Sequence, residues 1–153
     1  MVSADNTRYN KAHLWHSADF LVDGILEKNV FGGSCSVVYT ASKSELAWWM
    51  VDLGDTYAIR NVTLVNTENS VDSSYLETFE ITVGNTTERE NHTVCVRYAP
   101  RIGRAAHQEI QCDAVQVGRY LRIAKYEERN KVRMSCRFDF HFNFFSFVFC
   151  QSV

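Results

Sequence analysis

Two adjacent tryptophans open the segment that most constrains the fold, residues 48–54 (WWMVDLG). It concentrates the largest apolar surface in the chain on a stretch that is too short and too β-branched for a helix. The segment therefore predicts a buried β-strand. Residues 57–64 alternate between apolar and polar types, and Gly54-Asp55 between the two segments is a turn signal. We expect an antiparallel hairpin at the centre of a β-sandwich core.

Length and charge exclude several classes of protein. With 153 residues the chain is one domain of ordinary size, large enough to bury roughly two-thirds of its unfolded surface. Charged residues make up 22% and the net charge is −2, so the chain lacks the basic stripe that a phosphate backbone requires. We therefore expect no nucleic-acid partner and no transmembrane segment. An aromatic content of 13% with a single proline favours compact β-structure.

Short alternating segments elsewhere predict further strands. The clearest begins at Leu76, sets apolar residues against Glu77, Glu80 and Thr82, and ends at Gly84-Asn85. No helix signature longer than about two turns and no internal repeat is present. Short strands separated by turn residues predict an all-β sandwich or barrel. The other candidate segments are residues 37–39, 93–98, 108–112 and 118–124, and a last strand that runs from Val132 through Cys136 and Phe138.

Cysteine usage and glycosylation motifs favour the secretory route. Five cysteines exceed what a reduced domain of this size usually carries, and none forms a CxxC pair, so disulfides are a better interpretation than free thiols. Three N-glycosylation sequons agree, although such short motifs also arise by chance. The N-terminus has no apolar signal-peptide core, so either a signal peptide lies upstream or the protein is not exported. The cysteines are Cys35, Cys95, Cys112, Cys136 and Cys150, and the sequons begin at Asn61, Asn85 and Asn91.

A series of short motifs follows in a fixed order: Val22-Asp23-Gly24, Gly33-Ser34-Cys35, Trp48-Trp49-x-Val51-Asp52-Leu53, Tyr57-x-Ile59-x-x-Val62, Phe79-x-Ile81-x-Val83-Gly84, Cys95, Cys112, Gly118-Arg119-Tyr120-Leu121 and Cys136. No single motif is specific. Their number, order and spacing together resemble the F-type lectins, the fucolectin and tachylectin-4 relatives of the discoidin and coagulation-factor C domains. The resemblance covers about residues 10–141, which leaves an N-terminal tail at 1–9 and a Phe-rich C-terminal tail at 142–153.

The resemblance implies an all-β fold, a jelly-roll β-sandwich of about eight strands of the discoidin or galactose-binding-like type. It implies a secreted protein that binds terminal L-fucose through loops at one end and holds a structural calcium ion near the other. It also implies that Cys35 pairs with Cys136 and Cys95 with Cys112, which leaves Cys150 over. Constraining the 17-residue loop between Cys95 and Cys112 would contribute on the order of 3 kcal/mol.

Fucose recognition in this family depends on one histidine and two arginines, whose donors converge on the sugar hydroxyls. This sequence departs from the family at all three positions. The histidine position aligns with Val37 or Tyr39, the first arginine with Thr67, and the second falls near Ser74 or Tyr75. Losing several hydrogen bonds to charged groups, at about 1.5–3 kcal/mol each, should abolish fucose affinity of the family's kind. A solvated loop is a simpler interpretation here than a new polar rim, whose members would be Glu68, Asn69, Asp72 and Tyr75.

The calcium site that the resemblance implies is retained in part. Hard cations take oxygen ligands from carboxylates and backbone carbonyls. Arg137 replaces the acidic residue after the last cysteine and puts a positive charge where a ligand belonged. Asp23 could instead serve only as a turn former. The implied ligands are the side chains of Asp23 and Ser34 and the main-chain carbonyls of Phe20, Ile25 and Cys136.

An enzyme is not expected, because the five histidines are scattered without ligand spacing and neither a nucleophile elbow nor a Gly-rich phosphate loop occurs. The sequence predicts a secreted, calcium-associated, non-catalytic carbohydrate-binding module with a glycan as its partner and a degenerate fucose triad. The alternative is a non-lectin adhesion or structural module that binds protein or lipid through its loops. A homo-oligomer is compatible with the sequence, which does not specify the oligomeric state.

The segment after His141 is rich in phenylalanine and too short to span a bilayer as a helix. As an exposed edge it would aggregate. One interpretation is a tail that binds a partner or touches a membrane. The other, which we favour, is a truncated or mispredicted end.

Overall fold

The computed structural model describes the backbone of residues 2–4, 37–39, 48–66, 76–126, 133–135, 137–142 and 145–149, and the side chains within 48–64, at 66 and across 76–126. These parts are mostly antiparallel β-structure, with one short 3-10 helix, η4 (Arg89–Asn91). The strands are β1 (Val2–Ala4), β2 (Val37–Tyr39), β3 (Trp48–Val65), β4 (Phe79–Gly84), β5 (Thr93–Tyr98), β6 (His107–Lys125), β7 (Arg133–Ser135), β8 (Arg137–Phe142) and β9 (Phe145–Phe149).

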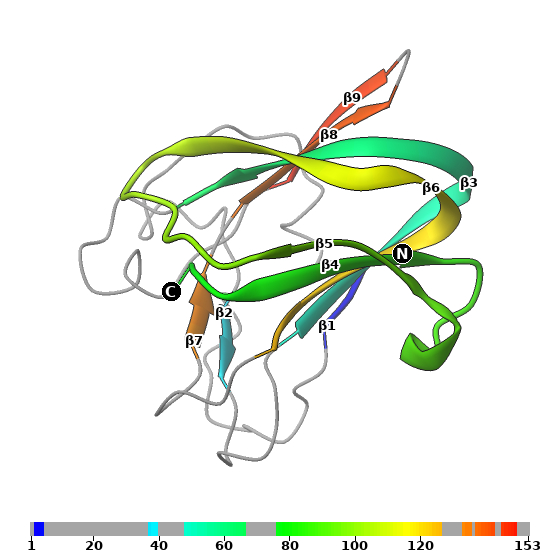
Figure 1. Ribbon diagram of the computed structural model, residues 1–153, viewed down its shortest axis with the longest axis horizontal. Coiled ribbons are helices and arrows are strands. Elements are labelled where there is room, and N and C mark those ends of the chain that lie inside the picture. Colours follow the sequence, from blue (N-terminus) through cyan, green and yellow to red (C-terminus); the bar gives the residue numbers. More distant parts are fainter. Residues whose placement is uncertain are drawn as a thin grey trace.

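The two long strands β3 and β6 organise the sandwich. They pair from Trp48 opposite Ala124 to Val65 opposite His107. The C-terminal part of β6 also pairs with β4, and the end of β3 pairs with β8, which gives the order β5-β4-β6-β3-β8-β9 with β1 beside β3. Figure 1 shows the β3–β6 pair curving round at one end, so that its two halves lie in different layers. One bent sheet thus supplies both layers, and the predicted β-sandwich is confirmed.

The predicted hairpin between residues 48–54 and 57–64 is wrong. Both segments belong to the single strand β3, and each has β6 as its partner. Gly54 has a φ of 82°, a conformation open to glycine at little cost, and the register shifts between Asp52 and Tyr57. The Gly-Asp signal therefore marks the bend at which β3 passes from one layer to the other, and the chain does not reverse there.

The tryptophan segment does lie in the core, as its sequence predicts. Trp49 is 1% exposed and belongs to one cluster with apolar residues of both halves of β3 and of β4, β5 and β6. A second register shift, between Ile59 and Asn61, spaces the inward residues of β3 as Ile59, Val62 and Leu64, all fully buried. This β-bulge explains why the apolar periodicity departs from two at this point.

Strand β4 confirms the predicted strand that ends at Gly84, but it begins later and is buried on both faces. Thr78 has a φ of 52°, so the extended backbone starts only after it. Glu80 and Thr82, the polar residues of the alternating pattern, are 4% and 1% exposed. The Glu80 carboxylate accepts a hydrogen bond from Arg89 at 2.5 Å and lies 3.5 Å from Arg97 Nε. Side chains of η4 and β5 therefore cover the face that alternation alone assigns to water.

The predicted last strand, from Val132 through Phe138, is divided into two elements. Strand β7 pairs with β2 in a separate two-stranded sheet, whereas β8 joins β3 in the main sheet. Within the predicted C-terminal tail, β9 pairs with β8 at the edge of the main sheet. Within the predicted N-terminal tail, β1 pairs with β3. Both tails therefore contribute strands.

A disulfide joins Cys95 to Cys112 and confirms the pairing implied by the family resemblance. Cys95 lies on β5, in the layer that contains β4. Cys112 lies on the half of β6 that pairs with the second half of β3. The bond therefore connects the two layers. The second implied pair, Cys35 with Cys136, and the leftover Cys150 lie outside the described residues.

Candidate functional site

The loop between β3 and β4 contains the predicted sugar-site positions Thr67, Ser74 and Tyr75, which lie outside the described residues. The structure describes the residues on either side of this loop and the connection between β5 and β6. In Figure 1 the β5–β6 connection lies at the end of the sandwich away from the bend of β3 and β6. We use the name anchored rim for Asn66, Leu76, Glu77 and residues 99–106.

Asn66 fixes the end of β3 to the β5–β6 connection. Its side chain is 1% exposed, and its Nδ2 donates to the carbonyl of Ile102 at 2.7 Å. Its backbone N–H donates to the carbonyl of Ala106 at 2.9 Å, and Ala106 donates to the carbonyl of Gly103 at 3.1 Å. The buried carboxamide is tolerated because its bond to the Ile102 carbonyl replaces a hydrogen bond with water. The point at which the chain leaves β3 is therefore held in place.

The same connection holds the segment that leads into β4. Ile102 donates its N–H to the carbonyl of Leu76 at 2.9 Å, and both side chains are buried. Nearer the surface, Arg101 Nε donates to Glu77 Oε2 at 3.0 Å. The Glu77 carbonyl also accepts a hydrogen bond from the ammonium group of Lys125. Both ends of the β3–β4 loop are thus tied to one platform.

The anchored rim presents a charged donor and a charged acceptor side by side. The Arg101 side chain is 57% exposed and the Glu77 side chain 31% exposed, so both groups reach water. The hydrogen bond to Glu77 raises the pKa of Arg101 above its ordinary value. Sugar hydroxyls both donate and accept, and a few placed polar groups of this kind orient a small ligand. Arg101 and Glu77 thus expose polar atoms at the rim while they bind each other.

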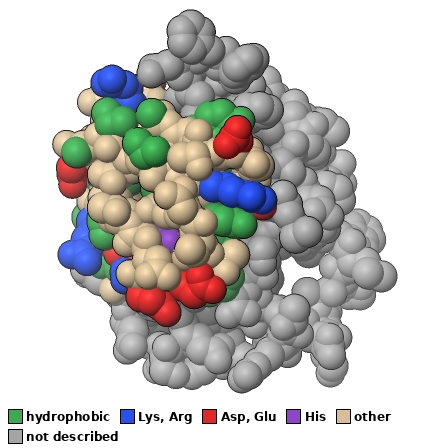
Figure 2. Space-filling view, turned by 90° about the vertical axis from the view of Figure 1, so that its right-hand side faces the viewer, with side chains coloured by type: hydrophobic (Ala, Val, Ile, Leu, Met, Phe, Trp, Pro, Cys, Tyr) green, Lys and Arg blue, Asp and Glu red, His purple; other side chains and the backbone are tan. Residues whose placement is uncertain are grey.

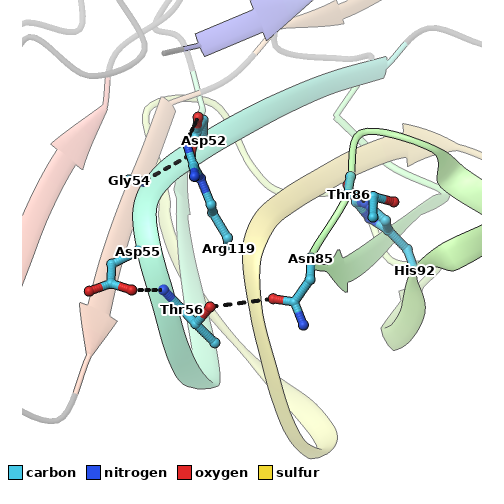
Figure 3. A network of polar contacts seen from close by, with 8 residues as sticks. All are labelled: Asp52, Gly54, Asp55, Thr56, Asn85, Thr86, His92 and Arg119. Carbon is cyan, nitrogen blue, oxygen red and sulfur yellow. Dashed lines mark hydrogen bonds and ion pairs between the residues drawn. The ribbon is translucent and has the colours of Figure 1, made fainter.

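An ion pair holds the bend at the opposite end of the sandwich (Figure 3). Arg119 donates from Nε to Asp52 Oδ1 at 2.6 Å and from Nη2 to Oδ2 at 2.7 Å, and the Gly54 N–H donates to Oδ1 at 2.9 Å. The bond from Arg119 is the largest cause that lowers the pKa of Asp52 from 3.8 to about 2. The same bond raises the pKa of Arg119, whose guanidinium also lies 5.3 Å from the centre of the Tyr120 ring. This pair serves the fold, because it joins β3 to β6 where both change layer.

Polar side chains of the β4–β5 connection lie beside the same bend. Thr56 Oγ1 donates to Asn85 Oδ1 at 3.4 Å (Figure 3). His92 Nε2 donates to the carbonyl of Thr86 at 2.8 Å, and its Nδ1 lies 3.2 Å from Thr82 Oγ1. Figure 2 faces this end of the molecule and shows acidic, basic and hydrophobic side chains in small separate groups among backbone and other side chains. This end is therefore a polar, solvated surface.

The structure describes the predicted site residues only in part. Val37 and Tyr39 lie on β2, which pairs with β7, but their side chains are outside the described set. Within residues whose side chains are described, no group of three or more His, Cys, Asp or Glu could hold a metal ion. Sequence reasoning missed Asn66, because no local pattern marks a polar residue at a strand end as buried. It missed Ile102 because the partner of this loop residue, Leu76, is distant in the sequence. The implied calcium ligands Phe20, Asp23, Ile25, Ser34 and Cys136 lie outside the described residues.

Comparisons with known proteins place this chain in a protein family. Residues 20–123 match the model of the NedA-like, galactose-binding domain. A fucolectin from striped bass (Morone saxatilis) serum has a TM-score of 0.69 at 18% identity, over 97% of this chain and 45% of that one. The lectin domain of lectinolysin, complexed with Lewis B antigen, has a TM-score of 0.65 at 21% identity, over 99% and 93%. CpGH89CBM32-5 from Clostridium perfringens, in complex with GalNAc-β-1,3-galactose, has a TM-score of 0.63 at 12% identity, over 89% of both chains.

These structures share the fold of this chain, which spans less than half the length of the striped bass protein, 45%. No curated protein sequence matches the chain. Within the parts that the structure describes, no helix is long and apolar enough to cross a membrane. Because the matched region covers more than half of the sequence, the chain belongs to the NedA-like, galactose-binding domain family, a group of F5/8 type C β-sandwiches.

Proposed function

We propose that this protein is a secreted, non-catalytic carbohydrate-binding module whose site lies at the anchored rim. Its family is named for galactose binding. Solved proteins of the same fold carry glycans, namely Lewis B antigen in lectinolysin and GalNAc-β-1,3-galactose in the C. perfringens protein. The ordered motifs and the Cys95–Cys112 disulfide support an origin in the F-type lectin branch of this fold.

One observation carries the proposal: buried hydrogen bonds tie both ends of the β3–β4 loop to one platform. Asn66 binds Ile102 and Ala106 on one side, and Ile102 binds Leu76 on the other. These bonds fix the polar groups of the anchored rim before a ligand arrives, which reduces the conformational entropy lost on binding. Hydrogen bonds to sugar hydroxyls add up to useful affinity only when their partners are already placed.

The proposed ligand is a neutral glycan that is not held by the fucose triad. The triad positions carry Thr67 and Ser74 or Tyr75 in place of the arginines, and Val37 or Tyr39 in place of the histidine. Each lost hydrogen bond to a charged group removes about 1.5–3 kcal/mol, which is about tenfold or more in affinity. Free L-fucose should therefore bind too weakly to compete with the true ligand.

A glycan array with galactosides, N-acetylgalactosaminides and Lewis-type fucosides tests this proposal. We expect binding to galactose or N-acetylgalactosamine termini that soluble L-fucose does not compete away. For the best array ligand, isothermal titration should show that Arg101→Ala and Tyr75→Ala each weaken binding about tenfold or more. Arg60→Ala is the matched control, because Arg60 is an exposed arginine in the middle of β3, away from the rim. Equal losses for Arg60→Ala and Arg101→Ala would contradict a site at the rim.

A module that binds protein or lipid through the same loops is the alternative outcome. The absence of the charged triad is the observation that favours it. A folded protein that binds no arrayed glycan and sediments with phosphatidylserine vesicles would replace the sugar proposal with a lipid-binding one. Vesicles of pure phosphatidylcholine serve as the control for charge.

A structural calcium ion is a separate proposal that rests on the family resemblance. A ligand that binds only the folded state stabilises it, by about 2.7 kcal/mol when its concentration is a hundredfold above Kd. Calcium added after dialysis against EDTA should therefore raise the unfolding temperature, magnesium should not, and Asp23→Ala should abolish the rise. An unchanged unfolding temperature in millimolar calcium would contradict the proposal. The ligands would be the side chains of Asp23 and Ser34 and the carbonyls of Phe20, Ile25 and Cys136.

A further inference from the structure

The three glycosylation sequons of the chain have very different structural settings. The sequon at Asn61 lies within β3, whereas those at Asn85 and Asn91 lie in the connection between β4 and β5. A glycan joined to the carboxamide nitrogen needs open solvent beside that atom and a backbone that can present it. The structure therefore allows the three sites to be ranked.

The Asn61 sequon is built into the sandwich. Asn61 is half-buried, and its Nδ2 donates to Glu109 Oε1 on β6 at 2.5 Å. The next two residues are buried, with Val62 fully enclosed in the core and Thr63 9% exposed. Both Asn61 and Thr63 are also paired with β6 in the sheet. A glycan here would have to fit against the paired strand β6 and its side chains, because the backbone of the sequon is fixed in the sheet.

The Asn85 sequon has the opposite character. Asn85 and the two threonines that follow it are all exposed, in the turn directly after β4. The Asn85 side chain uses its Oδ1 to accept from Thr56 Oγ1 at 3.4 Å (Figure 3). Among the described residues no hydrogen bond donated by its Nδ2 is found, so this nitrogen can take a glycan without loss of a contact.

The Asn91 sequon is also accessible. Asn91 ends η4 and Thr93 begins β5, and both are exposed. Asn91 Nδ2 donates to Thr86 Oγ1 at 3.4 Å, which uses one of its two N–H bonds. A glycan replaces only one of these hydrogens, so the contact can survive. His92 between them is half-buried and hydrogen-bonded to Thr86, which holds the segment in shape.

We propose that Asn85 and Asn91 carry N-linked glycans and that Asn61 stays unmodified. The inference rests on the secreted location in the proposed function. The donor is an oligosaccharide linked to a lipid pyrophosphate. The asparagine Nδ2 forms a bond to the anomeric carbon of the first sugar, the bond from that carbon to the pyrophosphate oxygen breaks, and the nitrogen gives up one proton. The lipid pyrophosphate leaves with the electron pair of the broken bond, and no oxidation or reduction takes place.

The position of these two sites has a consequence for the proposed binding surface. Asn85 stands beside the bend of β3 and β6, at the opposite end of the sandwich from the β5–β6 connection (Figures 1 and 3). Glycans on the β4–β5 connection would therefore cover the end marked by the Asp52–Arg119 pair. The anchored rim would stay open to an external ligand.

The test directs the full chain into the secretory pathway of cultured eukaryotic cells by an added signal peptide. Protein from the membrane fraction and from the medium is treated with N-glycosidase in heavy-oxygen water, which converts each occupied asparagine to a labelled aspartate. Peptide mapping should find the label at positions 85 and 91 and not at 61. On gels, N85Q and N91Q should each remove one mobility step, and N61Q, the matched control, should leave the mobility unchanged.

A labelled position 61, or the absence of label at either 85 or 91, would overturn the proposal. The membrane fraction is included because transfer occurs before export, so failed export still gives an answer. Array binding by the enzymatically deglycosylated protein is scored separately. If the label is found at positions 85 and 91 but the deglycosylated protein binds no arrayed sugar, the proposed function is contradicted. The proposed glycosylation sites are then still supported.

Discussion

The carboxylate of Asp52 accepts hydrogen bonds from Arg119 and Gly54 at the point where β3 changes layer. Because Arg119 binds the ionised form, the pKa of Asp52 falls from 3.8 to about 2 in the folded protein. The unfolded chain therefore takes up a proton at this group more readily than the folded chain as the pH falls. The contribution of Asp52 to stability is fully present above its unfolded pKa and is lost as the pH falls through its folded pKa.

Asp52→Asn should lower the free energy of unfolding at pH 7 by about 1–2 kcal/mol, since Arg119 is 43% exposed and water weakens the pair. The difference from the wild-type protein should shrink as the pH is lowered from about 5 to about 2. Urea denaturation across this range measures both effects. In an Arg119→Met background the same substitution should cost less, and equal costs in the two backgrounds would show that the pair is not responsible.

At the scale of strands, local periodicity located the elements and failed to predict how they pair. The predicted strand at 93–98 has the bounds of β5, because alternation is a property of neighbouring residues. The partner of the tryptophan segment is β6, more than fifty residues away in the sequence, and no pattern within 48–64 specifies that choice. The burial of Glu80 depends likewise on arginines of η4 and β5. Long-range contacts decide these features.

The candidate site was predicted only as positions along the chain. The family resemblance located the triad positions Thr67 and Tyr75 and showed that their residue types had changed. It could not reveal the platform on either side of them, because the bonds of Asn66 cross 36 residues to reach Ile102. An asparagine at a strand end usually indicates a turn. Only the folded chain shows that Asn66 is buried.

The close approach of β4 and β6 gives a prediction at the same scale. A Cβ atom at Gly118 would lie 2.7 Å from the Gly84 carbonyl oxygen and 2.7 Å from Val83 Cγ1. Gly118→Ala should therefore push the two strands apart and lower the free energy of unfolding by about 1–3 kcal/mol. Gly103→Ala is the matched control, because its Cβ would meet only the Ala106 Cβ, at 3.8 Å. Similar urea midpoints for the two variants would contradict this packing.

At the scale of the whole molecule, the Cys95–Cys112 disulfide connects the two layers across a sequence separation of 17. Replacing both cysteines with alanine should lower the free energy of unfolding by about 3 kcal/mol, because the unfolded chain gains freedom. Urea denaturation without reductant measures this loss. Adding reductant to the double variant gives a second result, since any further destabilisation would come from the proposed Cys35–Cys136 bond. A double variant as stable as the wild-type protein would contradict a stabilising role for the bond.

The bend of β3 and β6 also bears on how the molecule opens. Trp49 and Leu64 belong to one strand but to different layers, and both are hydrogen-bonded partners of β6. Neither layer can detach as a unit unless this shared pair breaks, so the sandwich should behave as one cooperative block. Amide hydrogen exchange at the two ends of β3 should then report the same opening free energy, with the fraying confined to connections and edge strands.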